Sequence, residues 1–224
     1  MEAGEVVVDL GGPRAGTLRY DAVLFDLLSA LLDSWTLWNT IAGDAERGRR
    51  WRLRYLERTG AEGRYRDYLT LVAEAAEHAG LGRSAAAALG ARWDEVAPWP
   101  EAGDALKRLS GRLRLGIVTN CSEALGARAA ARLGAPLEAV VTAERSGWYK
   151  PAGLAYAAGL KALGAPAART LFVAGSPFDV VGAAAAGMDV YFHDRAGLGD
   201  RVNPAQAMCV EPTLRALPRV AGVV

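Results

Sequence analysis

Polar side chains follow four short apolar runs of the sequence, and their types suit nucleophilic catalysis by a carboxylate. Asp26 directly follows the first run, and the later runs are followed by Thr119 with Asn120, Lys150, and Ser176 with Asp179. An aspartate nucleophile forms an ester with its substrate, and water then hydrolyses this ester. Lysine can keep such a carboxylate charged, a threonine hydroxyl can receive developing negative charge, and a second aspartate can activate the water. We therefore assign catalysis to Asp26, Lys150, Asp179 and Thr119.

The apolar runs themselves predict the elements that position these residues. They are short and rich in Val, Ile and Phe, and they cover residues 22–25, 115–118, 139–141, 171–174 and 189–192. Segments with helical spacing lie between the last four, as in 123–133 and 154–163. This alternation predicts an α/β fold in which helices cover both faces of a parallel sheet. Ligands bind at the carboxyl ends of such strands, which is where the polar residues stand.

The segment from Trp35 to Trp99 differs in composition from the rest of the chain. It is rich in Arg, Ala and Glu, and it contains every tryptophan except Trp148. Apolar residues recur at helical spacing and no strand pattern is evident. We predict a helical cap inserted into the core, so that the chain divides into an N-terminal extension at 1–19, a core at 20–33 and 100–224, and a cap at 34–99.

Composition narrows the class of protein. The 26 basic and 25 acidic residues nearly cancel, which argues against nonspecific nucleic-acid binding. Cys121 and Cys209 form no metal-binding spacing, and the histidines, His78 and His193, suggest no catalytic triad. The acidic N-terminus lacks a signal-peptide pattern, and no apolar run reaches membrane-spanning length. We expect a soluble cytoplasmic protein that acts on a small molecule and binds neither nucleic acid nor membrane; a homodimer through the cap is left open.

The order of four motifs resembles the haloacid dehalogenase superfamily. These motifs are VLFD at 23–26, IVTN at 117–120, YKP at 149–151 and LFVAGSPFDVVGAAAAGM at 171–188. The resemblance implies a Rossmann-like core with a helical cap inserted after the first motif. It also implies that Asp26 is the nucleophile and that Thr119 and Lys150 lie beside it.

Two substitutions separate the chain from the phosphatases of that superfamily. Those enzymes carry acids in DxDxT and GDSxxD motifs that hold a magnesium ion, whereas Leu28 and Gly175 stand at two of the acidic positions here. Magnesium requires oxygen ligands in near-octahedral geometry, and Asp26 with Asp179 offers too few of them. Leu28 also replaces the general acid that acts on the leaving group. We therefore predict no metal site and no cofactor.

The L-2-haloacid dehalogenases lack both of these acids, and the resemblance to them extends into the cap. The stretch WRLRYLE at 51–57 is similar to their WRxxxLE motif, whose arginine receives the departing halide and is Arg52 here. This branch typically has Tyr-Gly-Thr at 28–30 and asparagine at Ser176, so some of its hydroxyl groups are missing. We expect the substrate to be contacted by Arg52, Asn120, Ser176, Leu28 and Trp148.

Three hypotheses follow from these residues. The favoured one is a metal-independent hydrolase that displaces a leaving group through an Asp26 ester, most simply a 2-haloacid dehalogenase. The second is a Mg-dependent small-molecule phosphatase with a degraded metal site. The third is a catalytically impaired binding protein of the same fold.

Overall fold

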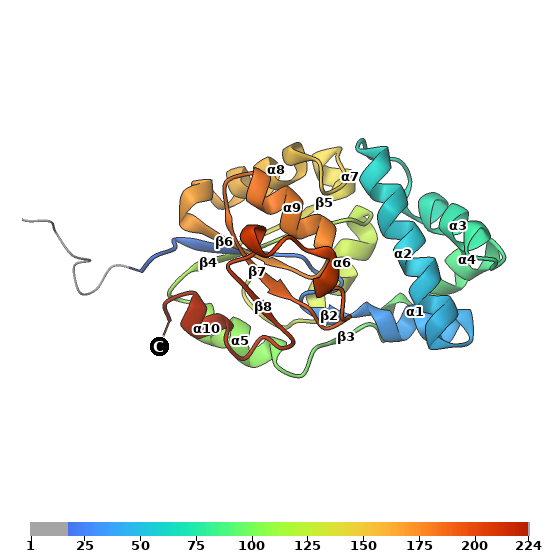
Figure 1. Ribbon diagram of the computed structural model, residues 1–224, viewed down its shortest axis with the longest axis horizontal. Helices are drawn as coiled ribbons and strands as arrows, with labels where there is room; N and C mark the ends of the chain where they lie inside the picture. Colours follow the sequence, from blue (N-terminus) through green and yellow to red (C-terminus); the bar gives the residue numbers. More distant parts are fainter. Residues whose placement is uncertain (1–17, 224) are drawn as a thin grey trace, which may run out of the picture.

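A six-stranded parallel sheet forms the centre of the computed structural model, which describes residues 18–223 (Figure 1). In spatial order its strands are β5 (Ala139–Thr142), β4 (Arg114–Thr119), β1 (Ala22–Phe25), β6 (Thr170–Ala174), β7 (Asp189–His193) and β8 (Cys209–Glu211). Five of these strands coincide with the five predicted apolar runs to within one residue at each end. They are β1, β4, β5, β6 and β7. β8 was not predicted, because its three residues include only one that is strongly apolar.

Burial of the central strand β1 on both faces explains why the predicted strands are continuous apolar runs in the sequence. All four of its residues are buried, and their side chains alternate between two core clusters. Val23 and Phe25 belong to one cluster, whereas Ala22 and Leu24 belong to the other. A strand buried on both faces cannot alternate apolar with polar residues. The parallel sheet covered on both faces is therefore confirmed.

Helices cover both faces of the sheet. α5 (Ala102–Leu109), α6 (Glu123–Ala131) and α10 (Leu217–Val220) contribute to the first cluster, and α8 (Gly153–Leu163) and α9 (Pro177–Ala185) to the second. Figure 1 shows α8 and α9 on the opposite side of the sheet from α5 and α10. The remaining short elements of the core are α7 (Ala143–Ser146), η2 (Ala167–Arg169), η3 (Gly199–Arg201) and η4 (Pro204–Gln206).

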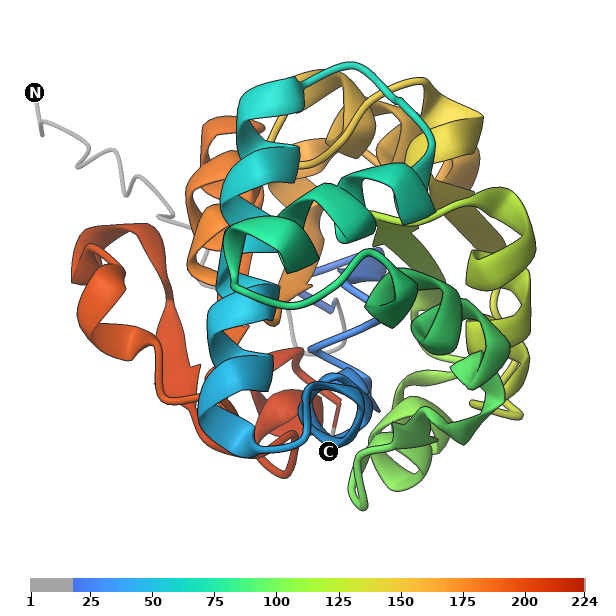
Figure 2. The ribbon, with the colours of Figure 1, turned by 90° about the vertical axis from the view of Figure 1, so that its right-hand side faces the viewer.

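Four helices and one short turn form a separate layer at one end of the sheet (Figure 2). They are α1 (Ser34–Ala42), α2 (Ala45–Glu62), α3 (Tyr68–His78), α4 (Ser84–Ala91) and η1 (Trp93–Glu95). The side chain of Asp33 caps α1, and Asp44 caps α2. Gly43 ends α1 with φ 94°, a left-handed conformation that favours glycine, so the chain reverses directly into α2. We call these helices the cap.

Aromatic residues form the interior of the cap. The ring centroids of Trp38 and Trp51 lie 4.3 Å apart, and the Trp51 indole donates a hydrogen bond of 3.0 Å to the carbonyl of Val72. The chain leaves and re-enters the core through an antiparallel pair formed by β2 (Leu32–Asp33) and β3 (Ala97–Pro98). β3 lies in the segment for which the sequence indicated no strand; two residues are too few to leave a periodic pattern. None of the helices described is long and apolar enough to cross a membrane.

Candidate active site

Three charged side chains meet where the strands β1 and β6 end. Nζ of Lys150 lies 2.9 Å from Oδ1 of Asp26 and 3.0 Å from Oδ1 of Asp179. All three residues are buried, with exposed fractions of 5% or less. Buried charges persist only when they are paired and hydrogen-bonded, and each of these carboxylates has the ammonium as its partner.

Burial and pairing act in opposite directions on the pKa values of these groups. Burial raises the pKa of Asp26, but the charge and hydrogen bond of Lys150 and the hydrogen bonds of Ser29 outweigh it, so the pKa lies below its usual value. Burial also raises the pKa of Asp179; there the charge of Asp26 adds to burial, and the pKa remains raised despite Lys150. Burial lowers the pKa of Lys150, but the two carboxylates reverse this and keep it charged. Lys150 and Ser29 therefore favour the charged form of Asp26, whereas burial favours the protonated form of Asp179.

The two oxygens of Asp26 have different surroundings. Oδ2 accepts three hydrogen bonds from the turn that follows β1: 2.7 Å from the Ser29 hydroxyl, 2.9 Å from the Ser29 N–H and 3.2 Å from the Ala30 N–H. Among the described residues, Oδ1 has only the ammonium of Lys150 as a partner. Oδ1 thus has fewer partners than Oδ2, which is held by three donors.

The carbonyl groups of this turn are also held in place. The indole Nε1 of Trp99 donates a 3.0 Å hydrogen bond to the carbonyl of Ser29. Nδ1 of His193, at the end of β7, lies 2.8 Å from the carbonyl of Ala30. Burial lowers the pKa of His193, so the ring is neutral, and its single proton is on Nδ1 because a carbonyl can only accept. His193 therefore contacts the turn that holds the nucleophile, a position that the sequence did not indicate.

Asn120 and Tyr156 position the other two charged groups. The amide of Asn120 accepts from the backbone N–H of Lys150 at 2.7 Å and donates to its carbonyl at 2.9 Å. The Tyr156 hydroxyl donates to Oδ1 of Asp179 at 3.0 Å, and the hydroxyl of Ser176 lies 3.3 Å from Oδ2 of Asp179. From the cap, Tyr55 donates a 2.6 Å hydrogen bond to the carbonyl of Asn120, which ties α2 to the core.

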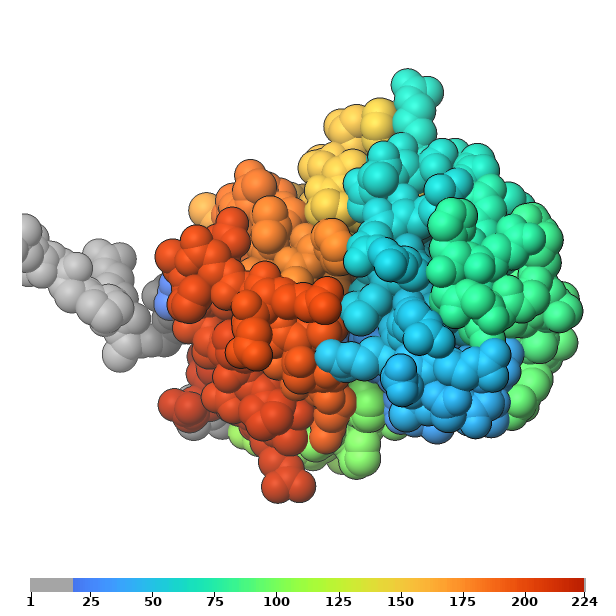
Figure 3. Space-filling model, turned by 45° about the vertical axis from the view of Figure 1, so that its right-hand side comes forward, coloured from blue at the N-terminus to red at the C-terminus, as the bar shows by residue number. Residues whose placement is uncertain are grey.

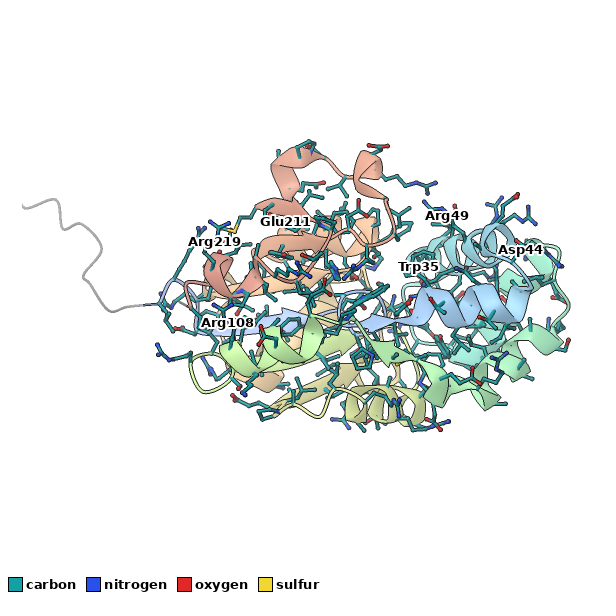
Figure 4. All side chains as sticks on the ribbon, turned by 90° about the horizontal axis from the view of Figure 1, so that it is seen from below. Trp35, Asp44, Arg49, Arg108, Glu211 and Arg219 are labelled. Atoms are coloured by element: carbon teal, nitrogen blue, oxygen red, sulfur yellow. The ribbon has the colours of Figure 1, made fainter. Side chains whose placement is uncertain are left out.

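Arg52 brings a buried cation from the cap. It lies on α2 with 2% of its surface exposed, and its guanidinium carbon is 4.8 Å from the ring centre of Trp35 and 5.1 Å from that of Trp38. Figure 4 shows Trp35 where the cap meets the core. Neither Nε nor Nη1 of Arg52 has a hydrogen-bond partner within residues 18–223, and burial lowers the pKa of the guanidinium. Unpaired buried donors on a cation favour an anion as ligand.

One small pocket joins these groups. Its cavity volume is about 20 Å³, enough for roughly one water molecule. Its walls contain every residue that the sequence singled out except Thr119 and Trp148, and they are Asp26, Leu28, Ser29, Arg52, Tyr55, Leu56, Thr59, Asn120, Lys150, Ser176, Phe178 and Asp179. Arg52 from the cap and Asp26 from the core therefore face one small pocket.

Thr119 and Trp148 lie near the pocket but outside its walls. Thr119 is buried at the end of β4, where its hydroxyl is 3.8 Å from the thiol of Cys121. The ring of Trp148 packs against the guanidinium of Arg64, 5.1 Å away. Their roles in catalysis and substrate binding stay predictions.

Sequence reasoning missed several groups that the structure brings to the site, among them Ser29, Tyr55 and Tyr156. Ser29 provides a hydroxyl to Asp26, at 2.7 Å from Oδ2. Its position three residues after the nucleophile is a signal that could have revealed it. Tyr55 follows Arg52 by three residues and so shares its helix face, which is a second usable signal. Tyr156 has no such signal, because it reaches Asp179 from α8 through the fold alone.

The surroundings of Asp26 and Asp179 do not fit a magnesium ion. Nζ of Lys150 already lies between the two carboxylates. A Cβ atom at Gly175 would lie 2.4 Å from the backbone nitrogen of Ala30, so the position has no room for another acid. Residues 18–223 contain no cluster of three or more His, Cys, Asp or Glu side chains that could hold a metal. These residues thus do not form a metal site with each other.

The fold and the match to a family model together define a hydrolase. The chain belongs to the haloacid dehalogenase-like hydrolases, whose family model matches residues 20–187. No curated protein sequence matches it.

Solved structures with the same fold include dehalogenases and a phosphatase. An L-2-haloacid dehalogenase is 25% identical, with a TM-score of 0.78 over 91% of this chain and 99% of that chain. The L-2-haloacid dehalogenase from Xanthobacter autotrophicus with chloropropionic acid covalently bound is 23% identical, with a TM-score of 0.73 over 91% of this chain and 98% of that one. A HAD phosphatase from Thermococcus onnurineus is 20% identical, with a TM-score of 0.64 over 91% and 98% of the two chains.

Proposed function

We propose that this hydrolase acts without a metal and displaces a leaving group from carbon, most simply a halide from a 2-haloalkanoic acid. The observation that carries the proposal is Arg52, a buried guanidinium with unpaired donors that faces the same pocket as the charged Asp26. A departing halide takes the electron pair of its bond to carbon and becomes an anion. A buried cation opposite the nucleophile stabilises that developing charge.

In the first step, Oδ1 of Asp26 attacks the carbon that bears the leaving group. The new C–O bond forms as the carbon–halogen bond breaks, and the halide moves toward Arg52. Lys150 holds Oδ1 in position and keeps Asp26 charged until attack. Because the nucleophile and the cation face one small pocket, there is little room for bulk water beside them while the ester forms.

In the second step, water attacks Cγ of Asp26, and Asp179 accepts a proton from it. Negative charge develops on Oδ2, where the two N–H groups and the Ser29 hydroxyl donate hydrogen bonds. The bond between Cγ and Oδ1 then breaks, and Oδ1 leaves with the 2-hydroxy acid, which takes the proton from Asp179. The other proton of the water goes to solvent when Asp26 returns to its charged form.

The proposal assigns no step to a metal. A phosphate monoester carries charge that repels a bare carboxylate, and a magnesium ion normally screens it. Lys150 occupies the space between Asp26 and Asp179, and the backbone at Gly175 leaves no room for a third acid. A singly charged haloacid needs less screening, so the residues suit it better than a phosphate.

The test is halide release from L-2-chloropropionate in the presence of EDTA. We expect release by the wild type and none by Asp26→Asn. A single turnover in heavy-oxygen water should place the heavy oxygen in Asp26 and not in the product. Release that EDTA abolishes, or that survives Asp26→Asn, contradicts the mechanism. If no halide is released but phosphate release rises with magnesium, the phosphatase hypothesis is favoured. Inactivity in both assays favours a binding protein.

Arg52 has a matched control on its own helix. Arg54 lies two residues away with 54% of its side chain exposed, and it pairs only with Glu57 among the described residues. We expect Arg52→Leu to lower kcat at least about 100-fold, as removal of a group that stabilises transition-state charge commonly does. Arg54→Leu should leave kcat within about twofold of the wild type. Equal effects of both changes would remove the role of Arg52.

A further inference from the structure

A second cavity lies next to the candidate active site, between the cap and the core. Its volume is about 190 Å³, and its walls come from α2, α9 and the segment around η3: Leu53, Leu56, Pro177, Phe178, Val181, Leu198 and Arg201. Figure 3 shows the seam along which this part of the core meets the cap. We call this cavity the apolar groove, because every residue of its wall except Arg201 is apolar.

The apolar groove and the active-site pocket share two walls. Leu56 and Phe178 line both of them, so the two spaces are neighbours. The pocket is small, at about 20 Å³, and Asp26, Lys150 and Arg52 are among its walls. The groove is larger, at about 190 Å³. A substrate whose charged end sits beside Asp26 therefore has an apolar space within reach of its other end.

The groove also exposes apolar surface that the fold does not require. Val181 is 45% exposed on α9, in the first two turns after Ser176. Burying such a side chain against an alkyl chain releases water from both surfaces and is favourable. Arg201 is exposed at the rim, where its aliphatic part can cover a chain while its charge remains in water.

From this arrangement we infer that the substrate carries an unbranched alkyl chain on the reacting carbon, and that the chain lies in the apolar groove. The inference rests on the proposed function and specifies its substrate class: 2-haloalkanoates of medium chain length in preference to 2-chloropropionate. Leu56 and Phe178 contact the chain, because both line the pocket and the groove.

The experiment compares kcat/KM for L-2-chlorohexanoate with that for L-2-chloropropionate. Each buried methylene is worth about fourfold in kcat/KM. We expect the wild type to favour the longer acid by about that factor per added methylene. Val181→Asp should reduce this preference at least about tenfold, since a charge in the groove loses hydration when the chain binds. It should leave turnover of L-2-chloropropionate unchanged.

Leu154→Asp is the matched control. Leu154 is 55% exposed on α8 and does not line the groove, so the same change should leave the chain preference intact. The inference is overturned if the wild type does not prefer the longer acid. It is also overturned if the Val181→Asp variant retains the preference, or if the Leu154→Asp variant loses it. If halide is released from neither acid, the proposed function itself is wrong. Turnover of L-2-chloropropionate tests that function separately from the chain preference.

Discussion

The indole of Trp99 and the backbone of Ser29 form a relay to the nucleophile. Nε1 of Trp99 donates to the carbonyl of Ser29 at 3.0 Å, and the N–H of that same peptide group, which belongs to Ala30, donates to Oδ2 of Asp26 at 3.2 Å. A hydrogen bond to one end of a peptide group strengthens the bond at its other end. Trp99 therefore acts on Asp26 through the backbone, although it does not line the pocket.

This relay predicts a selective effect of Trp99→Phe, which removes the donor and keeps an aromatic ring. The negative charge on Oδ2 is greatest while the ester is hydrolysed. Loss of the Trp99 hydrogen bond should therefore slow ester hydrolysis about tenfold, whereas the rate of ester formation should change little. The ester should then accumulate during turnover. Intact-protein mass spectrometry measures it as the added mass of the carboxyalkyl group.

Trp93→Phe provides the control for the relay. The Trp93 indole also donates a buried hydrogen bond, at 2.9 Å to the carbonyl of Leu125, but it has no contact with the turn after β1. Both variants should lose similar stability in thermal unfolding. If Trp93→Phe also accumulates ester, or if Trp99→Phe slows both steps equally, the relay has no part in catalysis.

Gly175 gives a prediction about packing beside the nucleophile. An alanine there would place Cβ 2.4 Å from the backbone nitrogen of Ala30 and 2.5 Å from the backbone carbon of Ser29. Backbone atoms cannot yield as a flexible side chain can, so the turn must shift. We expect Gly175→Ala to lower the free energy of unfolding by about 1–3 kcal/mol and to reduce halide release. Urea denaturation and the halide assay measure the two effects.

A glycine with free space around it serves as the comparison. Gly153 is the first residue of α8, and a Cβ atom added to it would meet no other atom within 4 Å. Gly153→Ala should be neutral or stabilising by up to about 1 kcal/mol, since alanine loses less conformational entropy on folding. A Gly175→Ala variant as stable and active as Gly153→Ala would show that the turn is not held as tightly as its contacts indicate.

The sequence predicted the core because its strands are buried on both faces and therefore stand out as apolar runs. It also predicted that Asp26, Lys150 and Asp179 would meet, since the carboxyl ends of parallel strands share one edge of the sheet. It could not predict the roles of Trp99 and His193. Both act on backbone carbonyls, and such contacts depend on where the chain returns from the cap rather than on residue type or spacing.

Tyr156 predicts how the pH dependence of ester hydrolysis can be shifted. Asp179 must be charged to accept a proton from water, so hydrolysis falls as the pH decreases through its pKa, which burial raises above 3.8. The Tyr156 hydroxyl stabilises the charged form and lowers that pKa. Tyr156→Phe should therefore move the acidic limb of the kcat profile to higher pH.

Tyr191→Phe tests whether this shift is specific. The Tyr191 hydroxyl donates to the carbonyl of Thr213 at 2.6 Å and has no contact with Asp179. Its removal should leave the acidic limb of the profile in place. If the Tyr156→Phe variant is folded by circular dichroism and its acidic limb does not move, another group limits ester hydrolysis at low pH.

Glu74 predicts the pH dependence of stability in the cap. It lies on α3 and accepts hydrogen bonds from Arg66 and Arg58; these bonds lower its pKa from 4.5 to about 2 despite the opposing effect of burial. Because the pKa of Glu74 is lower in the folded state than in the unfolded state, its ionised carboxylate stabilises the fold. This stabilisation is complete above pH 4.5 and is lost as the pH falls toward 2. Glu74→Gln should therefore reduce the slope of unfolding free energy against pH in this window. Glu57→Gln removes an exposed acid on α2 and should leave the slope nearly unchanged. Urea denaturation at a series of pH values measures both slopes, and equal slopes for the wild type and Glu74→Gln would exclude this role for Glu74.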